Sequence, residues 1–450
     1  MSTMKAINEK FAQIVRDYPK ENFKSGQAAV EYMEGSTAIY RGIPVACLYM
    51  PKLITPDAWA AFQAAAATIV GILDKVIQKY LDDANYRKLF PFSPRLEELI
   101  LTEAGYPRLL PIARLDIFFN EDDYSFQFCE FNADGASAMN EDREINIALS
   151  DGHAMSKLRE DYEITTFEFF DSWVHEFAEI YKSYTRAVKS PRIVITDFME
   201  GATSNEFIQF QKAFRNAGYE TDICEIRDFI YENGKLRTPD GRQVDAIYRR
   251  AVTRDIMDNI DAIPAFLQAA RENAVCFVGH FRTQIIHNKA IFRILRLPET
   301  LSFLTEAEQK YVLAHIPETS RLNAGEFDLR EVCQNKDDWI IKPEDLYGSR
   351  GVFAGVDMDA DVWKEAVESS MNTGYLLQRF CPPYKSPNMD FNASPRPEIA
   401  MYNNITGMFV YNGKLQGIYS RAGLKGTISP FTNGMTLASV RISCTETHKQ

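Results

Sequence analysis

The chain has 450 residues, which at ordinary domain sizes is room for roughly two or three packed modules. Apolar residues make up 46% and aromatic residues 12%, enough for a large core without disulfides or structural metals. The net charge of -12, from 62 acidic and 50 basic side chains, argues against nucleic acid or an anionic membrane as the main partner, because either needs a basic face.

The cysteines and the N-terminus bear on the compartment. The seven cysteines form no CxxC pair and several lie in apolar, strand-like runs, so we expect buried free thiols in a reducing compartment. The first residues, MSTMKAINEKFAQ, lack the apolar core of a signal peptide. No uninterrupted run of about 18 apolar residues occurs. We therefore expect a cytoplasmic protein without a membrane-spanning helix.

Residues 1–110 form the first expected region, which is helical and packs on the core. Within it, residues 56–83 are rich in alanine and carry apolar residues at helical spacing. Thr55 and Pro56 supply a cap and a proline at the first helical position. The pattern predicts a long structural helix.

The second region, 111–190, combines a β-hairpin with a helical connector. Two runs of apolar and β-branched residues flank the polar sequence NEDD, a pattern typical of a hairpin. Asp116 lies on the first run, and Glu130 and Asn132 end the second on one face, since they are two residues apart. Magnesium prefers oxygen ligands, so these three are candidate metal ligands. The alternative is a polar strand end that faces water.

The third region, 191–300, alternates strand and helix patterns. RIVITDF and YETDICEI read as strands on either side of the helical SNEFIQFQKAFRNAG, which is a βαβ unit. VDAIYRR and AVCFVG add two strands before the helix-like TQIIHNKAIFRIL. The alternation predicts an open α/β sheet.

The fourth region, 301–450, contains a glycine loop. WIIKPEDLYGSRGVFAGV predicts two strands joined by a loop of Gly348, Ser349, Arg350 and Gly351. A Walker loop would instead carry GK[ST] and lead into a helix. A loop of this kind can fold over a polyphosphate, with its N–H groups and Lys342 on the oxygens. A plain glycine turn is the commoner explanation.

Two further strand patterns follow the glycine loop. YLLQRF places Gln378, Arg379 and Phe380 on a strand that could contact adenine in a two-lobed nucleotide site, or could be an ordinary buried strand. EIAMYNNITGMFVYNGKLQGIYSRAG predicts a hairpin that turns at Asn-Gly. Arg421, at its end, could offset the charge that grows on a carboxyl-phosphate, or could be solvated surface.

Taken in order, these motifs resemble the glutathionylspermidine synthase family of ATP-grasp ligases, in its synthetase domain and over roughly residues 110–430. The motifs that carry the resemblance are Arg114-Leu115-Asp116, Glu130-Phe131-Asn132-Ala133-Asp134, Asn288-Lys289-Ala290-Ile291, Ile341-Lys342-Pro343 before the glycine loop, Gln378-Arg379-Phe380, and Gly417 followed by Arg421. The E-F-N-A-D and N-K-A-I runs are the most specific of them.

The resemblance implies roles for particular residues. Asp116, Glu130 and Asn132 would bind magnesium, Lys289 and Lys342 would bind ATP phosphates, and Arg421 would stabilise the transition state. Gly135-Ala136-Ser137 stands where the family has threonine, proline and serine residues that contact glutathione, and no amidase domain is found. The resemblance therefore favours ATP chemistry over glutathione or spermidine as substrates.

We expect a mixed α/β (α+β) protein with an ATP-grasp fold, preceded by a domain like the pre-ATP-grasp α/β domain. The cofactors would be ATP and Mg²⁺, and the substrates a small-molecule or peptide carboxylate and an amine. The carboxylate would attack the γ-phosphate, and the amine would displace phosphate from the acyl-phosphate to leave an amide. The ATP site would comprise Lys289, Lys342, Gly348, Ser349, Arg350, Gly351, Gln378, Arg379 and Phe380.

Substrate contacts are expected from Arg114, Ser137 and Glu141, which lie on or just past the metal-ligand hairpin. For Ser137 and Glu141, a helix cap and a solvated acid are the alternatives. Two other functions stay open, a small-molecule kinase of the ATP-grasp type and a non-catalytic nucleotide-binding module. The oligomeric state is left open.

Overall fold

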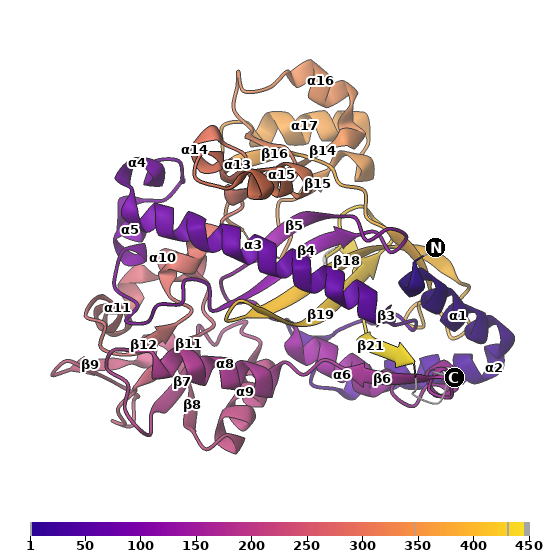
Figure 1. The fold of residues 1–450 in the computed structure, drawn as a ribbon, viewed down its shortest axis with the longest axis horizontal. Coiled ribbons are helices and arrows are strands. Elements are labelled where there is room, and N and C mark those ends of the chain that lie inside the picture. The colour runs from indigo at the N-terminus through magenta and orange to yellow at the C-terminus, as the bar shows by residue number, and fades with distance from the viewer. Residues whose placement is uncertain (1, 347, 430–431, 445–450) are drawn as a thin grey trace.

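The computed structural model of the chain describes residues 2–346, 348–429 and 432–444. Figure 1 shows a central sheet with three groups of elements around it. One group contains the N-terminal helices, the second an α/β unit and the third a small lobe that contains the glycine loop.

The central sheet joins two hairpins that lie far apart in the sequence. Its strands run in the order β20-β19-β18-β4-β5, β17 pairs with β18, and all neighbours are antiparallel. They are β4 (Ile112–Phe119), β5 (Phe126–Asn132), β17 (Lys385–Asn388), β18 (Ala400–Tyr411), β19 (Lys414–Gly423) and β20 (Met435–Leu437). Both predicted hairpins are present, and Asn412 and Gly413 turn the second one with positive φ angles.

The two faces of this sheet have opposite characters. Along β4, Leu115 and Ile117 point into the main hydrophobic cluster, which they share with α3 (Pro56–Asp82). Arg114 and Asp116 alternate with them and therefore lie on the other face. The long predicted helix thus covers the apolar face and leaves the polar face for a site.

By length and apolar composition alone, α3 could cross a membrane, since its most apolar 18-residue window has a mean hydropathy of 1.5. Half of that window is buried inside the protein. A core helix passes the same test. Polar residues interrupt the apolar run of α3, so the sequence contains no uninterrupted apolar stretch of that length.

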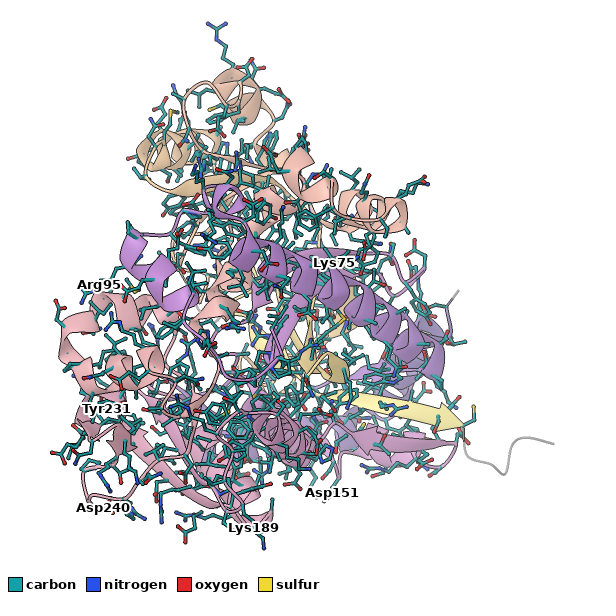
Figure 2. The ribbon with its side chains drawn as sticks, turned by 60° about the vertical axis from the view of Figure 1, so that its left-hand side comes forward. Lys75, Arg95, Asp151, Lys189, Tyr231 and Asp240 are labelled. Carbon is teal, nitrogen blue, oxygen red and sulfur yellow. The ribbon has the colours of Figure 1, made fainter. Side chains whose placement is uncertain are left out.

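Helix α3 also contacts the helices beside the small lobe. Lys75 on α3 forms an ion pair with Glu308 of α15 (Glu306–His315) at 2.7 Å, and Figure 2 shows Lys75 in place on α3. Helices α14 (Pro298–Leu301) and α15 lead into the small lobe, which has the strand order β13-β16-β14-β15. Its strands are β13 (Thr319–Arg321), β14 (Trp339–Pro343), β15 (Phe353–Ala354) and β16 (Tyr375–Arg379), packed on α16 (Leu329–Gln334) and α17 (Ala360–Ser370).

The α/β unit contains a parallel sheet of order β12-β11-β7-β8. Its strands are β7 (Arg192–Asp197), β8 (Glu220–Glu225), β11 (Ala246–Arg249) and β12 (Cys276–Val278), with helices α8 (Phe170–Lys182), α9 (Ser204–Asn216), α10 (Thr253–Asp258) and α11 (Pro264–Arg271) and a small hairpin of β9 (Ile230–Glu232) and β10 (Lys235–Arg237). The predicted strands are all present. The chain leaves β7 toward β8 on one side and returns to β11 on the other, so the carboxyl ends of β7 and β11 form a switch point, where ligands of such sheets bind.

Two segments differ from the sequence prediction. Residues 281–295 form three short pieces, η3 (Phe281–Thr283), α12 (Gln284–His287) and α13 (Ile291–Leu295), because Asn288 takes an extended conformation and its side chain accepts from the Ala290 N–H. In the expected helical connector, β6 (Tyr162–Thr166) is a strand that pairs with β21 (Ser439–Cys444). Its β-branched residues favour that outcome.

The N-terminal elements close the remaining side of the molecule. They are α1 (Thr3–Asp17), α2 (Pro19–Gly35), β1 (Ile39–Tyr40), β2 (Ile43–Pro44) and β3 (Lys52–Ile54), joined by α6 (Met139–Leu149) and α7 (His153–Leu158). The short helices α4 (Ala84–Arg87) and α5 (Pro94–Ile100) lie at the opposite end of α3, beside α14 and the α/β unit (Figure 1). β21 lies between β3 and β6 in a three-stranded sheet. Helix α6 packs on β20 and β21 and therefore reaches the edge of the polar sheet face.

Gly407 of β18 should be required for that polar face. A Cβ there would lie 2.8 Å from Arg114 Cδ and 2.8 Å from Asp116 Oδ1. We expect Gly407→Ala to destabilise the protein by about 1–3 kcal/mol, as overpacking does. Gly423→Ala is the matched control on β19, since its nearest neighbour would be 3.5 Å away. Equal thermal unfolding midpoints for the two variants would contradict the assignment.

Candidate functional site

The polar face of the central sheet centres on a buried ion pair. Arg114 donates from Nε to Asp116 Oδ1 at 2.7 Å and from Nη2 to Oδ2 at 3.0 Å. Asn132, directly across on β5, donates to Asp116 Oδ2 at 3.1 Å. Arg421 Nη2 lies 3.5 Å from the same oxygen. The structure therefore brings four of the predicted site residues into one contact network.

Glu130 forms a second charged group, next to this network, with the predicted lysines. Asp116 and Glu130 are paired residues of β4 and β5, and Lys289 Nζ lies 2.8 Å from Glu130 Oε1. Burial disfavours the charged form of Glu130, but the charges of Lys289 and Lys342 outweigh it and lower its pKa to about 2. Lys342 donates to Gln378 Oε1 at 2.8 Å. Glu130 is therefore an anion held between two cations.

A small enclosed cavity of about 60 Å³ lies where β5, the small lobe and β19 meet. Residues that line it include Glu130, Lys289, Lys342, Gln378, Phe380 and Arg421. Beside it, the Asp357 carboxylate accepts from the N–H groups of Gly426 and Thr427, two residues that line the cavity, at 2.9 Å each. This contact joins the small lobe to the segment after β19. We call the cavity the closed pocket.

A much larger cleft of about 960 Å³ lies on the other side of Arg421. It runs from Arg421 to the switch point of the α/β sheet, where Asp197 and Arg250 line it, and the β1–β2 hairpin borders it. Among the described residues, Arg421 alone lines both the cleft and the closed pocket. Its Nε is buried without a hydrogen-bond partner in the described part of the chain. Arg421 thus has an unused donor where the two spaces meet.

The loop after β5 forms one wall of the cleft. Ala138 has a left-handed φ of 94°, which is rare for a residue with a Cβ, and Ser137 accepts from Arg114 Nη1 through its carbonyl at 2.7 Å. Glu206 holds the loop, because its Oε2 accepts from the Ala138 and Asn140 N–H groups at 3.1 Å each. Ser137 and Glu141 both line the cleft.

The glycine loop lies at the boundary between the two spaces. Gly348 and Arg350 line the cleft, whereas Ser349 lines the closed pocket. Gly348, Ser349 and Gly351 all have positive φ angles, between 57° and 68°. The loop is therefore a tight, left-handed turn beside the lysine pair, although residue 347 lies outside the described residues.

The three residues of the predicted adenine-contacting strand contribute to the closed pocket to different extents. Phe380 lines the closed pocket, and the Gln378 side chain is buried between Lys342 and Thr319. Arg379 lies over the ring of Trp339 at 4.0 Å and is 40% exposed, although it also borders the pocket. Its guanidinium is therefore committed to the outer side of the strand.

Sequence reasoning missed three residues of the site. Tyr419 lies on the same strand face as Arg421, and its position two residues earlier was the available signal. For Gly407, the available signal was a glycine within an apolar strand. His287 lines the cleft, and its Nδ1 is buried without a partner among the described residues; nothing in its local sequence indicates this.

The sequence predicts Asp116, Glu130 and Asn132 as oxygen ligands of a hard cation. Across residues 2–346, 348–429 and 432–444, no group of three or more histidine, cysteine, aspartate and glutamate side chains could hold a metal. The predicted set is of a different kind, two carboxylates and one amide; Asn132 is hydrogen-bonded to Asp116, whereas Glu130 is paired with Lys289. Its oxygen chemistry suits Mg²⁺, which keeps few protein ligands and takes others from water and phosphate.

The comparisons with known proteins extend over nearly the whole chain. No protein-family model matches, and no curated protein matches the sequence. A glutathione synthetase-like effector from Globodera pallida, solved in its apo form, superposes with a TM-score of 0.60 at 10% identity, over 93% of this chain and 96% of that chain. A proposed gamma-glutamylcysteine synthetase from Methylobacillus flagellatus gives 0.43 at 10% identity, over 82% and 87%. The chain therefore has the fold of a glutathione synthetase-like protein.

Asp197 should make stability depend on pH. Burial at the end of β7 raises its pKa to about 7, although Arg250 acts in the opposite direction. A carboxyl with a raised folded pKa costs stability as pH rises above its unfolded pKa, and the full cost applies above the folded pKa. We expect Asp197→Asn to raise the Tm by several degrees near pH 8 and to leave it unchanged near pH 4. A pH-independent difference would contradict this assignment.

Proposed function

We propose that the protein is a Mg-ATP-dependent carboxylate–amine ligase of the ATP-grasp kind, similar to glutathionylspermidine synthase. The observation that carries the proposal is the position of Arg421, which lines both the closed pocket with the lysine pair and the large cleft. In a ligase that makes an acyl-phosphate, phosphoryl donor and carboxylate acceptor must meet at one point. An arginine with an unused donor at that point suits the charge that develops there.

In this proposal the closed pocket is the site of ATP. Lys289 and Lys342 hold the phosphates, Phe380 borders the base, and the loop of Gly348 to Gly351 covers them. Residues 191–300 supply the preceding α/β domain and residues 301–450 the ATP-grasp lobe. Because the pocket measures only about 60 Å³, nucleotide binding requires the Asp357 contact to open and the lobes to part.

The carboxylate substrate lies in the cleft beside Arg114 and Ser137. Its oxygen attacks the γ-phosphorus, and the amine then attacks the resulting acyl-phosphate and releases phosphate. Arg421 neutralises charge in both steps. Asp116, Glu130 and Asn132 would hold Mg²⁺, which when bound would neutralise the phosphate oxygens. In the structure, Arg114 and Arg421 contact Asp116, and Lys289 contacts Glu130. Basic side chains of the protein therefore balance the charges of these two carboxylates.

The proposal is tested by a substrate screen with hydroxylamine as a general amine. Purified protein with Mg-ATP is mixed with amino acids, γ-glutamylcysteine or glutathione, each with hydroxylamine, methylamine or spermidine. A ligase releases ADP and forms hydroxamate or amide in proportion. A carboxylate kinase releases ADP and forms no methylamide or spermidine amide, although the acyl-phosphate that it releases still gives hydroxamate with hydroxylamine. A binding module releases no ADP. The last two outcomes would each overturn the proposal.

ATP binding should depend on magnesium and on Glu130. We expect Mg-ATP to raise the Tm more than ATP alone, because ligand binding to the folded state stabilises it. Glu130→Gln removes the charge between the lysines and should abolish the magnesium-dependent part. Glu160→Gln, on an exposed side chain, is the control. Equal shifts with and without magnesium in the wild type would move the metal site elsewhere.

Arg421→Ala should lower kcat on the order of a hundredfold, as the loss of one transition-state donor does. ATP affinity should change little, since the lysines hold the phosphates. Arg421→Lys should restore activity only in part, because an ammonium lacks the planar set of donors. Arg441→Ala, at an exposed arginine of β21, serves as the control. A loss confined to ATP affinity would make Arg421 a ground-state phosphate ligand instead.

A further inference from the structure

Glu141 occupies a defined position at the floor of the cleft. It lies in the first turn of α6, and its Oε2 accepts from Tyr419 Oη at 2.5 Å and from Thr436 Oγ1 at 3.4 Å. Its Oε1 accepts no hydrogen bond from any residue that the structure describes, and the residue lines the cleft. One carboxylate oxygen is thus fixed while the other is an available acceptor.

Tyr419 connects this carboxylate to the proposed reaction point. Its ring lies between two guanidinium groups, with Arg114 Cζ 5.5 Å and Arg421 Cζ 5.9 Å from the ring centroid. Glu141 is therefore one side chain away from both arginines, on the cleft side of Arg421. A group that reacts at Arg421 from the cleft would pass beside Glu141.

The charges around Glu141 allow it to exchange a proton. Burial raises the pKa of its carboxyl, the Tyr419 hydroxyl and the charges of Arg421 and Arg114 oppose that rise, and Glu206 adds to it. The pKa of Tyr419 is raised far above its ordinary value by burial and by Glu141, so the phenol stays a donor. Glu141 is thereby a stronger base than an exposed glutamate and keeps its orientation.

The ligase reaction needs such a base. An alkylamine is an ammonium ion at neutral pH and must lose a proton before its nitrogen can attack. Asp116 is bonded to Arg114, and Glu130 is paired with Lys289 on the pocket side. Neither carboxylate faces the cleft with an available oxygen in the way that Glu141 does. Among the described carboxylates that line the cleft, Glu141 is the one joined through Tyr419 to Arg421.

We propose that Glu141 is the general base that deprotonates the attacking amine, an assignment that rests on the proposed ligase function. One ammonium proton passes to Glu141 Oε1, and the freed nitrogen lone pair forms the C–N bond. The second proton that the nitrogen loses on becoming an amide leaves with the phosphate. The bond between the acyl carbon and the phosphate oxygen breaks, and its electron pair leaves with phosphate. Glu141 then returns the proton to water in the cleft.

The test uses two amines that differ in their need for a base. Hydroxylamine is largely uncharged at neutral pH, whereas methylamine is almost wholly protonated. With Mg-ATP and the carboxylate that gives the most hydroxamate, we expect Glu141→Gln to keep hydroxamate formation within about threefold of wild type. Methylamide formation should fall on the order of a hundredfold, the usual loss for a general base. Raising the pH should restore the methylamine rate.

The Tyr419→Phe variant distinguishes a role of Glu141 as a base from a purely structural role. It removes the hydrogen bond to Glu141 but keeps the carboxylate, so the methylamine rate at neutral pH should stay well above that of Glu141→Gln, which recovers only as the pH is raised. Equal losses with both amines in Glu141→Gln would make the residue structural and overturn the assignment. An unchanged methylamine rate would also overturn it. If wild type forms no hydroxamate with any carboxylate, the ligase function itself fails, and the assignment fails with it.

Discussion

The ion pair of Arg114 and Asp116 is the interaction on which the rest of the site depends. Both side chains lie across Gly407 in the middle of the central sheet, and Asp116 is only 1% exposed. A buried pair is stable only if its remaining donors and acceptors are satisfied. Asn132 and the Ser137 carbonyl satisfy them, which fixes the end of β5 and the cleft loop relative to the sheet. The pair therefore fixes the positions of the candidate metal ligands Asp116 and Asn132 and of the loop after β5 that lines the cleft.

The charge balance of this face indicates an anionic ligand. Asp116 and Glu130 are outnumbered by Arg114, Lys289, Lys342 and Arg421, and Arg421 has a buried Nε without a partner among the described residues. A surplus of desolvated cations is costly unless an anion completes it. In the proposed function, a polyphosphate would meet that need from the pocket side and a carboxylate from the cleft side. The same need for charge compensation explains why Arg114 and Arg421 contact Asp116 and why Lys289 contacts Glu130 within the chain.

Much of this could be predicted from local sequence, and the remainder depended on long-range contacts. The R-x-D and E-x-N spacings place Asp116 and Glu130 on facing strands because strand periodicity is two, and Asn-Gly at 412–413 fixes the second hairpin. No local pattern pairs β18 with β4, although that pairing brings Arg421 to Asp116. The break in the helix at Asn288, just before Lys289, could not be predicted either. The apolar spacing of residues 284–295 is helical throughout.

Some of the strained backbone and perturbed side-chain states of the molecule lie near Arg421. Ala138 and Ser349 have left-handed φ angles on the two loops that flank it, and Asp197 carries a raised pKa at the far end of the same cleft. Such features lower stability and persist where the surroundings hold them in place, as Glu206 holds Ala138. Strain of this kind is common at sites that must present groups in a fixed geometry. These features lie on the cleft side, opposite the well-packed face under α3, so the proposed function uses the polar face of the sheet while the apolar face supplies stability.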